Sequence, residues 1–294
     1  MVLNSEQDRD MIEVIPTGKA LGAEIRGVDL SRPLEPADVQ SLLDAWTEHL
    51  VLLFRGQYIS DPELISFSRI FGDLDPCPPN ALGKQHSAEH MELAIVSNVI
   101  VDGEPLGSLG DCELRWHTDM SNHPVPPKAS ILHALEVPPE GGETEFCNMY
   151  AVTQELPQHL RAAIEGKWAH QDGGLDSAGA PHRAVEIDGV RREPPSAQHP
   201  LMRLHPDTGR PVLYLGRRPN QYIVGMDADE SDALLDELWE HATQDKYVWT
   251  HEWIVGDIIV WDNRCAMHRR NAFPSAARRT LHRTQVTGEA IIAA

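Results

Sequence analysis

Short runs of β-forming residues recur along this chain of 294 residues and constrain its fold more than any other feature. Each run is rich in Val, Ile, Leu, Thr or Trp and is bounded by Gly, Pro, Asp or Asn, which is typical of short strands joined by turns. Because no internal repeat is present, we expect a mainly β fold with peripheral helices, a double-stranded β-helix (jelly roll) whose sheets enclose a cavity. The runs lie at residues 11–34, 51–54, 93–101, 129–137, 143–147, 213–215, 247–254, 257–262 and 280–286.

Helical periodicity is confined to a few segments, which predicts that helices lie outside the sheets. In the first, residues 36–50, apolar side chains fall on one face. The second, residues 62–71, begins with Pro62 at the first helical position, and Asp61 is the expected N-cap. Two more helices are expected at residues 156–165 and 230–243.

Length and loop content predict one domain over residues 1–294, because β-rich barrels and sandwiches often exceed two hundred residues. Residues 73–92 are rich in Pro, Gly and His and form a long irregular loop. A second irregular stretch, residues 173–200, has the composition of an insertion, and we expect it to cover the cavity as a lid.

The net charge of the chain restricts the classes of molecule that it can bind. The chain has 25 basic and 45 acidic residues, a net charge of −20, so nucleic acid and anionic membranes are poor partners. A small anionic substrate would need a locally basic pocket. The four cysteines form no C-x-x-C pair, which indicates reduced thiols. With no leader-like N-terminus and no apolar run of membrane-spanning length, the expected location is the cytoplasm.

The segment from Arg115 to Asn122 carries the clearest chemical signal. His117 and Asp119 flank one residue, so on a β-strand their side chains would project from the same face. His268 follows an apolar run far downstream. Two histidines and one carboxylate are the facial triad that leaves three positions open on iron. Alone, a His-x-Asp pair is weak evidence, because a surface loop with ordinary hydrogen bonds also fits it.

Several recognisable blocks follow one another along the chain. They are Leu21-Gly-Ala-Glu-Ile-Arg-Gly-Val-Asp-Leu30, Phe54-Arg-Gly-Gln57, Trp116-His-Thr-Asp119, Pro138-Pro-Glu-Gly-Gly-Glu-Thr-Glu-Phe146, His205-Pro-Asp-Thr-Gly209, Trp261-Asp-Asn-Arg264, His268 and Arg278-Arg279 with Arg283. In this order the blocks resemble the taurine and 2,4-dichlorophenoxyacetate dioxygenase family of 2-oxoglutarate enzymes. The likeness covers nearly the whole chain and is closer to the aryloxyacetate branch.

The resemblance implies a role for particular residues. It implies His117, Asp119 and His268 as ligands of Fe(II), and Thr144 and Arg279 as anchors of the distal carboxylate of 2-oxoglutarate, which a guanidinium and a hydroxyl suit well. A surface salt bridge is the alternative for Arg279.

Two further residues are candidates for the substrate. Arg283, four residues after Arg279, matches the family arginine that meets the anionic end of the primary substrate. It could instead support the cosubstrate. Asn98 could line the pocket, although a strand-end asparagine also fits. Lys84, His86 and His90 in the preceding loop offer further cationic or hydrogen-bonding groups.

The implied activity is hydroxylation of a small anionic substrate with 2-oxoglutarate and O2 as cosubstrates, releasing succinate and CO2. A carboxylate such as an aryloxyalkanoate is the first expectation, and a taurine-like sulfonate is the alternative. A metal-binding jelly roll without oxygenase activity is a further alternative, but it would not need Thr144 and Arg279. The resemblance also implies a homodimer or homotetramer.

Overall fold

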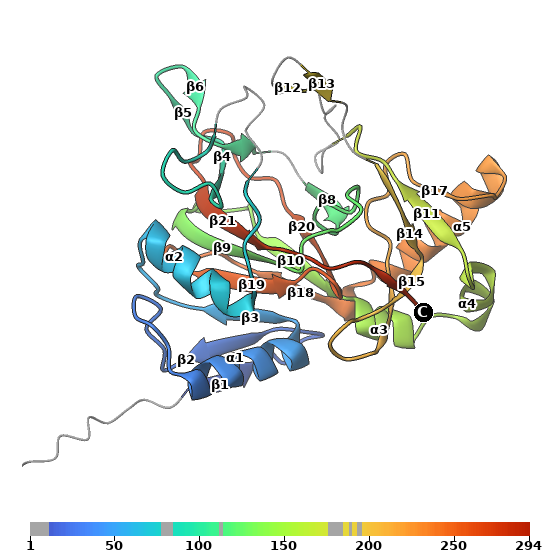
Figure 1. Ribbon diagram of the computed structural model, residues 1–294, viewed down its shortest axis with the longest axis horizontal. Coiled ribbons are helices and arrows are strands. Elements are labelled where there is room, and N and C mark those ends of the chain that lie inside the picture. The colour runs from blue at the N-terminus through green and yellow to red at the C-terminus, as the bar shows by residue number, and fades with distance from the viewer. Residues whose placement is uncertain (1–11, 78–84, 112–113, 176–184, 188–189, 193–195) are drawn as a thin grey trace, which may run out of the picture.

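The computed structural model describes residues 12–77, 85–111, 114–175, 185–187, 190–192 and 196–294. Its centre is an eight-stranded sheet in the order β1-β2-β3-β19-β9-β21-β4-β7 (Figure 1). Neighbouring strands are antiparallel except β2–β3 and β4–β7. The strands are β1 Glu13–Pro16, β2 Ala23–Arg26, β3 Val51–Phe54, β4 Ala94–Ser97, β7 Ser108–Leu109, β9 Ala129–Glu136, β19 Ile258–Asp262 and β21 Thr280–Val286.

A four-stranded antiparallel sheet faces this large sheet, in the order β18-β10-β20-β8. Its strands are β8 Leu114–His117, β10 Thr144–Asn148, β18 Val248–His251 and β20 Ala266–Arg270. Apolar side chains of both sheets meet in one buried cluster, for example Leu132 and Ile259 from the large sheet with Phe146 and Met267 from the small one. The two facing sheets confirm the mainly β jelly roll.

Helices cover the outer face of the large sheet. Helix α1 (Pro36–His49) and helix α2 (Asp61–Ser68), continued by the 3-10 turn η1 (Arg69–Phe71), pack there through a second apolar cluster. All four residues of β3 are therefore buried, as expected for a strand covered on both faces. The expected N-cap Asp61 is wrong: Ser60 caps α2, because its hydroxyl and its backbone N–H both bond Glu63 in a capping box.

Most of the remaining elements lie on the right in Figure 1. They include strands β11, β14, β15 and β17 of two three-stranded sheets, β14-β11-β17 and β16-β15-β22, and helices α4 and α5. Two hairpins complete the fold, β5-β6 above β4 and β12-β13. The bounds are β11 Trp168–Gln171, β14 Ala197–Pro200, β17 Tyr222–Ile223, β15 Met202–Leu204, β16 Pro211–Leu213, β22 Ile292–Ala293, β5 Ile100–Val101, β6 Glu104–Pro105, β12 Val185–Ile187, β13 Val190–Arg192, α3 Met149–Gln154, α4 Gln158–Ile164, α5 Ala228–Ala242 and η2 Asp245–Tyr247.

Part of the predicted lid lies outside the described residues. Within residues 173–200 the structure describes β12, β13 and β14, whereas residues 176–184, 188–189 and 193–195 are not described. The lid therefore stays a prediction. Within the described part of the chain, no helix combines the length and the apolar character that crossing a membrane requires.

Candidate active site

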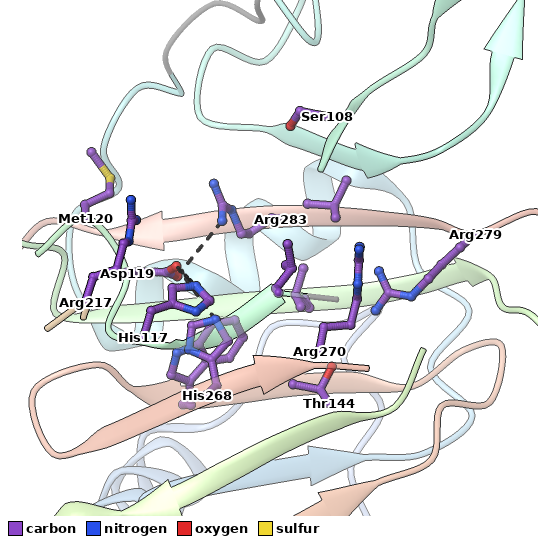
Figure 2. Close-up of a pocket in the computed structure, with 14 residues that line it drawn as sticks. Ser108, His117, Asp119, Met120, Thr144, Arg217, His268, Arg270, Arg279 and Arg283 are labelled. Atoms are coloured by element: carbon purple, nitrogen blue, oxygen red, sulfur yellow. Dashed lines mark ion pairs between the residues drawn. The ribbon is translucent and has the colours of Figure 1, made fainter. Parts of the chain in front are cut away.

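Three potential metal ligands converge between the two sheets. His117 ends β8, His268 lies opposite it on β20, and the Asp119 carboxylate points toward both rings (Figure 2). Asp119 Oδ1 is 3.5 Å from His117 Nε2 and 3.7 Å from His268 Nε2. One ligand atom from each residue lies within 4.8 Å of the others, and all three residues are buried. A single ion could therefore contact all three.

Hydrogen bonds orient two of these side chains toward the common point. His117 Nδ1 lies 2.7 Å from the Arg115 carbonyl. Because a carbonyl only accepts, Nδ1 must carry the proton and Nε2 must present a lone pair. Asp119 Oδ2 accepts bonds from Ser130 Oγ at 2.7 Å and Gln285 Nε2 at 3.3 Å, which leaves Oδ1 directed at the histidines.

The position of Asp119 depends on tertiary contacts and not on strand alternation. Strand β8 ends at His117, and Asp119 lies in the turn that follows. Asn263 fixes this turn, because its Oδ1 accepts from the Asp119 N–H at 2.9 Å and its Nδ2 donates to the Asp119 carbonyl at 3.1 Å. The expectation of one continuous strand was therefore wrong, although the two side chains do meet.

The charge states of these groups suit a divalent metal. Burial lowers the pKa of His268 to about 3. Burial by itself would raise the pKa of Asp119, but its interactions with His268, His117 and Arg283 hold that pKa well below its usual value. At neutral pH the site offers a neutral imidazole and an ionised carboxylate, as metal ligation requires.

Thr144 and Arg279 lie at another end of the same pocket (Figure 2). Arg279 directly precedes β21 and is only 2% exposed. Within the described part of the chain, no carboxylate forms an ion pair with it, and its Nε has no hydrogen-bond partner. Its guanidinium faces the rings of Trp253 and Phe273, each at 5.9 Å. A buried cation in such surroundings is costly unless an anion joins it.

Neighbouring residues also affect the pKa of Arg279 and the hydrogen bonding of Thr144. Burial, together with the charge of Arg270, lowers the pKa of Arg279 to about 9. Thr144 Oγ1 accepts a hydrogen bond of 2.9 Å from Trp253 Nε1. A hydroxyl that accepts this bond keeps its own proton to donate to a ligand. Thr144 and Arg279 thus present a hydroxyl donor and a guanidinium to the pocket.

Two consecutive glycines allow a close approach to the chain segment that precedes Arg279. Gly141 and Gly142 both adopt φ +74°, a left-handed conformation that glycine tolerates. A Cβ at Gly141 would lie 2.7 Å from the Ala272 carbonyl oxygen, and one at Gly142 would lie 3.2 Å from Pro138 Cγ. The Gly141-Gly142 pair is therefore needed for the close approach of the two chain segments.

Arg283 lies near the potential metal ligands. It extends from β21 toward Asp119, with Nη1 4.0 Å from Asp119 Oδ2, and its side chain is 21% exposed. His86, in the loop before β4, lies close enough to Arg283 to interact with its charge. Burial, followed by that charge, lowers the pKa of His86. Lys84, another candidate from that loop, lies outside the described residues.

Asn98 does not line this pocket. Its side chain accepts a bond from the Arg279 backbone N–H at 3.0 Å and donates to the Ala277 carbonyl at 2.8 Å. It borders a surface groove with Ser97 and Ser108. Its amide holds the chain that leads into β21, and contact of Asn98 with the substrate stays a prediction.

Two further arginines, Arg217 and Arg270, line the pocket and were missed from the sequence. Arg270 was detectable in principle, because it lies two residues after His268 on β20 and directly opposite Thr144 on β10. Arg217 follows β16 in a loop, and no local pattern marks it. The pocket is lined by Val96, Ser108, Leu114, His117, Asp119, Met120, Leu132, Thr144, Arg217, Trp261, His268, Arg270, Arg279 and Arg283.

A second buried cluster, His205, Asp262 and Cys265, also has ligand-type atoms close together. Here Asp262 accepts hydrogen bonds from Arg264 Nε at 2.9 Å and Nη2 at 2.8 Å, and it lies 3.0 Å from His205 Nε2. Because a guanidinium already balances the carboxylate, this cluster is a structural ion pair. It accounts for Asp262 and Arg264 in the Trp261-Asp-Asn-Arg264 block.

Comparison with known proteins agrees with this geometry. The family model described as taurine catabolism dioxygenase TauD, TfdA family matches residues 13–285. An alpha-ketoglutarate-dependent 2,4-dichlorophenoxyacetate dioxygenase of Cupriavidus pinatubonensis is 34% identical over 94% of this chain and 98% of its own. An (S)-phenoxypropionate/alpha-ketoglutarate-dioxygenase of Delftia acidovorans is 30% identical over 94% and 95%. The crystal structure of a putative alpha-ketoglutarate-dependent taurine dioxygenase from Burkholderia xenovorans superposes with a TM-score of 0.78 at 30% identity, covering 96% of this chain and 92% of that one.

Proposed function

Since this chain belongs to the taurine catabolism dioxygenase TauD, TfdA family and is a dioxygenase that uses Fe(II), 2-oxoglutarate and O2, we propose which residues of its pocket bind the metal, the cosubstrate and the substrate. His117, Asp119 and His268 hold the Fe(II). Thr144 and Arg279 hold 2-oxoglutarate, and Arg283 holds the anionic end of the substrate. The observation that carries this assignment is one pocket that joins three converging ligand atoms to a buried arginine, which has no carboxylate partner among the described residues.

The donor set supports the iron assignment. Two imidazoles and one carboxylate from a single face leave open positions, as in non-haem Fe(II) oxygenases. When bound, Fe(II) supplies the activation of O2 that couples decarboxylation of 2-oxoglutarate to hydroxylation of the substrate. The chain contributes the fixed orientation of its ligands: the Arg115 carbonyl holds His117, and Ser130 and Gln285 hold Asp119.

The cosubstrate assignment is supported by the shape and charge of the Thr144 end. Arg279 can meet a carboxylate through two parallel N–H groups, and Thr144 can add a hydroxyl donor. The apolar faces of Trp253 and Phe273 keep water from the guanidinium, which strengthens such a contact. This pair would fix the distal carboxylate and so direct the keto acid toward the metal ligands.

For the substrate we propose a small carboxylate with an apolar body, of the aryloxyalkanoate class. The location of Arg283 beside Asp119 supports an anionic head close to the reacting centre, and two relatives bear names of aryloxyalkanoate dioxygenases. With an aryloxyacetate, hydroxylation beside the ether oxygen would give a hemiacetal that collapses to a phenol and glyoxylate. A sulfonate is the second candidate, because Arg283 would also bind that oxyanion.

One assay tests this proposal. Purified enzyme with Fe(II), 2-oxoglutarate and O2 is given a panel of aryloxyalkanoates, other carboxylates and sulfonates, and both succinate and hydroxylated product are measured. We expect equal amounts of succinate and product with at least one aryloxyalkanoate. Stoichiometric turnover of sulfonates alone would transfer the proposal to the sulfonate class. No coupled turnover of any anion would refute it.

We further propose that residues 1–294 form a single dioxygenase domain, with residues 173–200 as its lid. The protein would act in the cytoplasm as a homodimer or homotetramer. The net charge of −20 supports the absence of nucleic acid and membrane partners. Light scattering of the purified protein would test the oligomeric state.

A further inference from the structure

Four arginines line the pocket, and they are arranged as two pairs (Figure 2). Arg270 and Arg279 lie beside Thr144. Arg217 and Arg283 lie on either side of Asp119. The proposed function uses only Arg283 from the second pair. It assigns no role to Arg217, a residue that is only 7% exposed and lies beside Asp119 in the same pocket.

The backbone of Arg217 is fixed directly beside the potential metal ligands. Arg217 forms an isolated antiparallel bridge with His117, and the Thr118 N–H donates to the Gly216 carbonyl at 2.9 Å. Gln171 holds the same turn, because its Oε1 accepts from the Arg217 N–H at 3.1 Å. A Cβ at Gly216 would overlap this Gln171 side chain, and Gly216 adopts φ +67°. The turn is therefore shaped to bring Arg217 to this position.

The side chain of Arg217 is oriented as well. Its Nη1 donates to the Leu175 carbonyl at 2.6 Å. A guanidinium carries five N–H groups in a planar fork, so it can hold a carbonyl and an oxyanion at once. Arg283 alone gives a weaker hold, because its side chain is partly exposed to water and lies 4.0 Å from Asp119.

We infer that Arg217 is a second substrate-binding residue, and that the carboxylate head of the substrate lies between the guanidiniums of Arg217 and Arg283. This inference rests on the proposed function and deepens it by adding a specificity-determining residue. With Asp119 between them, the two cations also offset the repulsion between that carboxylate and the incoming one. The pocket thereby selects acids over their neutral analogues.

The test compares the best acid from the panel described above with its neutral amide. The ratio of kcat/KM for the acid to kcat/KM for the amide is measured for the wild type, Arg217→Gln and Arg283→Gln. Arg218→Gln is the matched control, because the adjacent Arg218 forms ion pairs with Asp232 and Asp236 on α5 and is not among the residues that line the pocket. Apparent affinity for 2-oxoglutarate is measured for every variant.

We expect Arg217→Gln to lower the acid-to-amide ratio by about tenfold, the size of one charge-assisted contact, with the amide and 2-oxoglutarate values within about twofold of wild type. The Arg218→Gln enzyme should keep the full ratio. If Arg217 served only to hold Leu175, acid and amide turnover would fall together and the ratio would stay unchanged, which would overturn the inference. Should the Gln variant fail to fold, Arg217→Lys keeps the charge without the fork and should lower the ratio by about threefold.

The experiment separates failure of the proposed function from failure of the role inferred for Arg217. A wild-type enzyme that turns over no acid in coupled fashion would remove the proposed function and this inference with it. A wild-type enzyme that prefers the acid, with an Arg217→Gln variant that keeps the whole preference, would remove the inference alone.

Discussion

The two ends of the pocket hold their cations in opposite ways. At one end Arg279 is 2% exposed, faces two aromatic rings and has no carboxylate partner among the described residues. At the other end the Arg283 side chain is 21% exposed and lies 4.0 Å from Asp119. The Arg279 end excludes water and suits a ligand that is the same in every turnover. The Arg283 end is accessible to solvent and borders a loop, so it can adapt to different substrates.

The largest effect should come from the three potential metal ligands, which lie at the Arg283 end of the pocket. We predict that His117→Ala, Asp119→Ala or His268→Ala abolishes turnover, because loss of one ligand weakens both iron affinity and the geometry of the open positions. Iron content after reconstitution and succinate formation would be measured together. Full activity with one iron per chain in any of these variants would contradict the assignment of that residue.

The next largest effects are expected from Arg279→Ala and Arg283→Ala, measured side by side. Arg279→Ala should raise the requirement for 2-oxoglutarate by about tenfold or more, because a charge-assisted bidentate contact contributes roughly 1.5 to 3 kcal/mol. Its requirement for the substrate should change far less. Arg283→Ala should do the reverse: it should keep 2-oxoglutarate binding but release succinate without a matching amount of hydroxylated product. If both variants lost the same ligand, the two ends would not be separate sites.

The variant Trp253→Phe tests the Arg279 end of the pocket alone, because it removes one N–H and keeps most of the aromatic surface over Arg279. Without the 2.9 Å bond from Trp253 Nε1, the Thr144 hydroxyl is free to rotate away from the ligand. The loss of one neutral hydrogen bond, about 1 kcal/mol, predicts about a fivefold weaker apparent affinity for 2-oxoglutarate. Substrate KM serves as the internal control and should not change. An unaltered 2-oxoglutarate affinity would show that Trp253 does not orient Thr144.

The smallest effect should follow Asn98→Ala. The amide of Asn98 joins the Ala277 carbonyl to the Arg279 N–H, so its loss should cost about 1 kcal/mol of stability and weaken 2-oxoglutarate binding by no more than about threefold. Thermal unfolding and 2-oxoglutarate titration would measure both. A rise in substrate KM alone would instead support Asn98 as a substrate-binding residue.

Some secondary-structure elements could be predicted from the sequence more easily than others. Strands β3 and β19 were predictable because a sheet covered on both faces leaves nearly uninterrupted apolar runs. Strand β11 has only four residues, and the last two, His170 and Gln171, are polar, so its local signal is weak. The capping of α2 by Ser60 was missed because Asp61 and Ser60 are both good caps, and only the Glu63 contact decides between them.

Within the site, the residues in recognisable sequence blocks could be predicted, and a residue outside such a block could not. His117, Asp119, His268, Thr144, Arg279 and Arg283 all line one pocket, as the resemblance implied. Arg217 reaches the pocket because Gln171, in β11, and Gly216 shape the turn after β16. No pattern near Arg217 in the sequence records that contact. The hydrogen bonds of Asn98 were equally invisible in the sequence, since its partners are about 180 residues away.

The two arginines that divide the pocket belong to one strand, since Arg279 immediately precedes β21 and Arg283 lies within it. A displacement of β21 along its length that tightened one guanidinium on its ligand would also move the other. The two binding equilibria would then share a coupling free energy, and reciprocity requires that each ligand change the affinity of the other by the same factor. Cooperativity between cosubstrate and substrate would thus be a property of a single β-strand and would need no movement of domains.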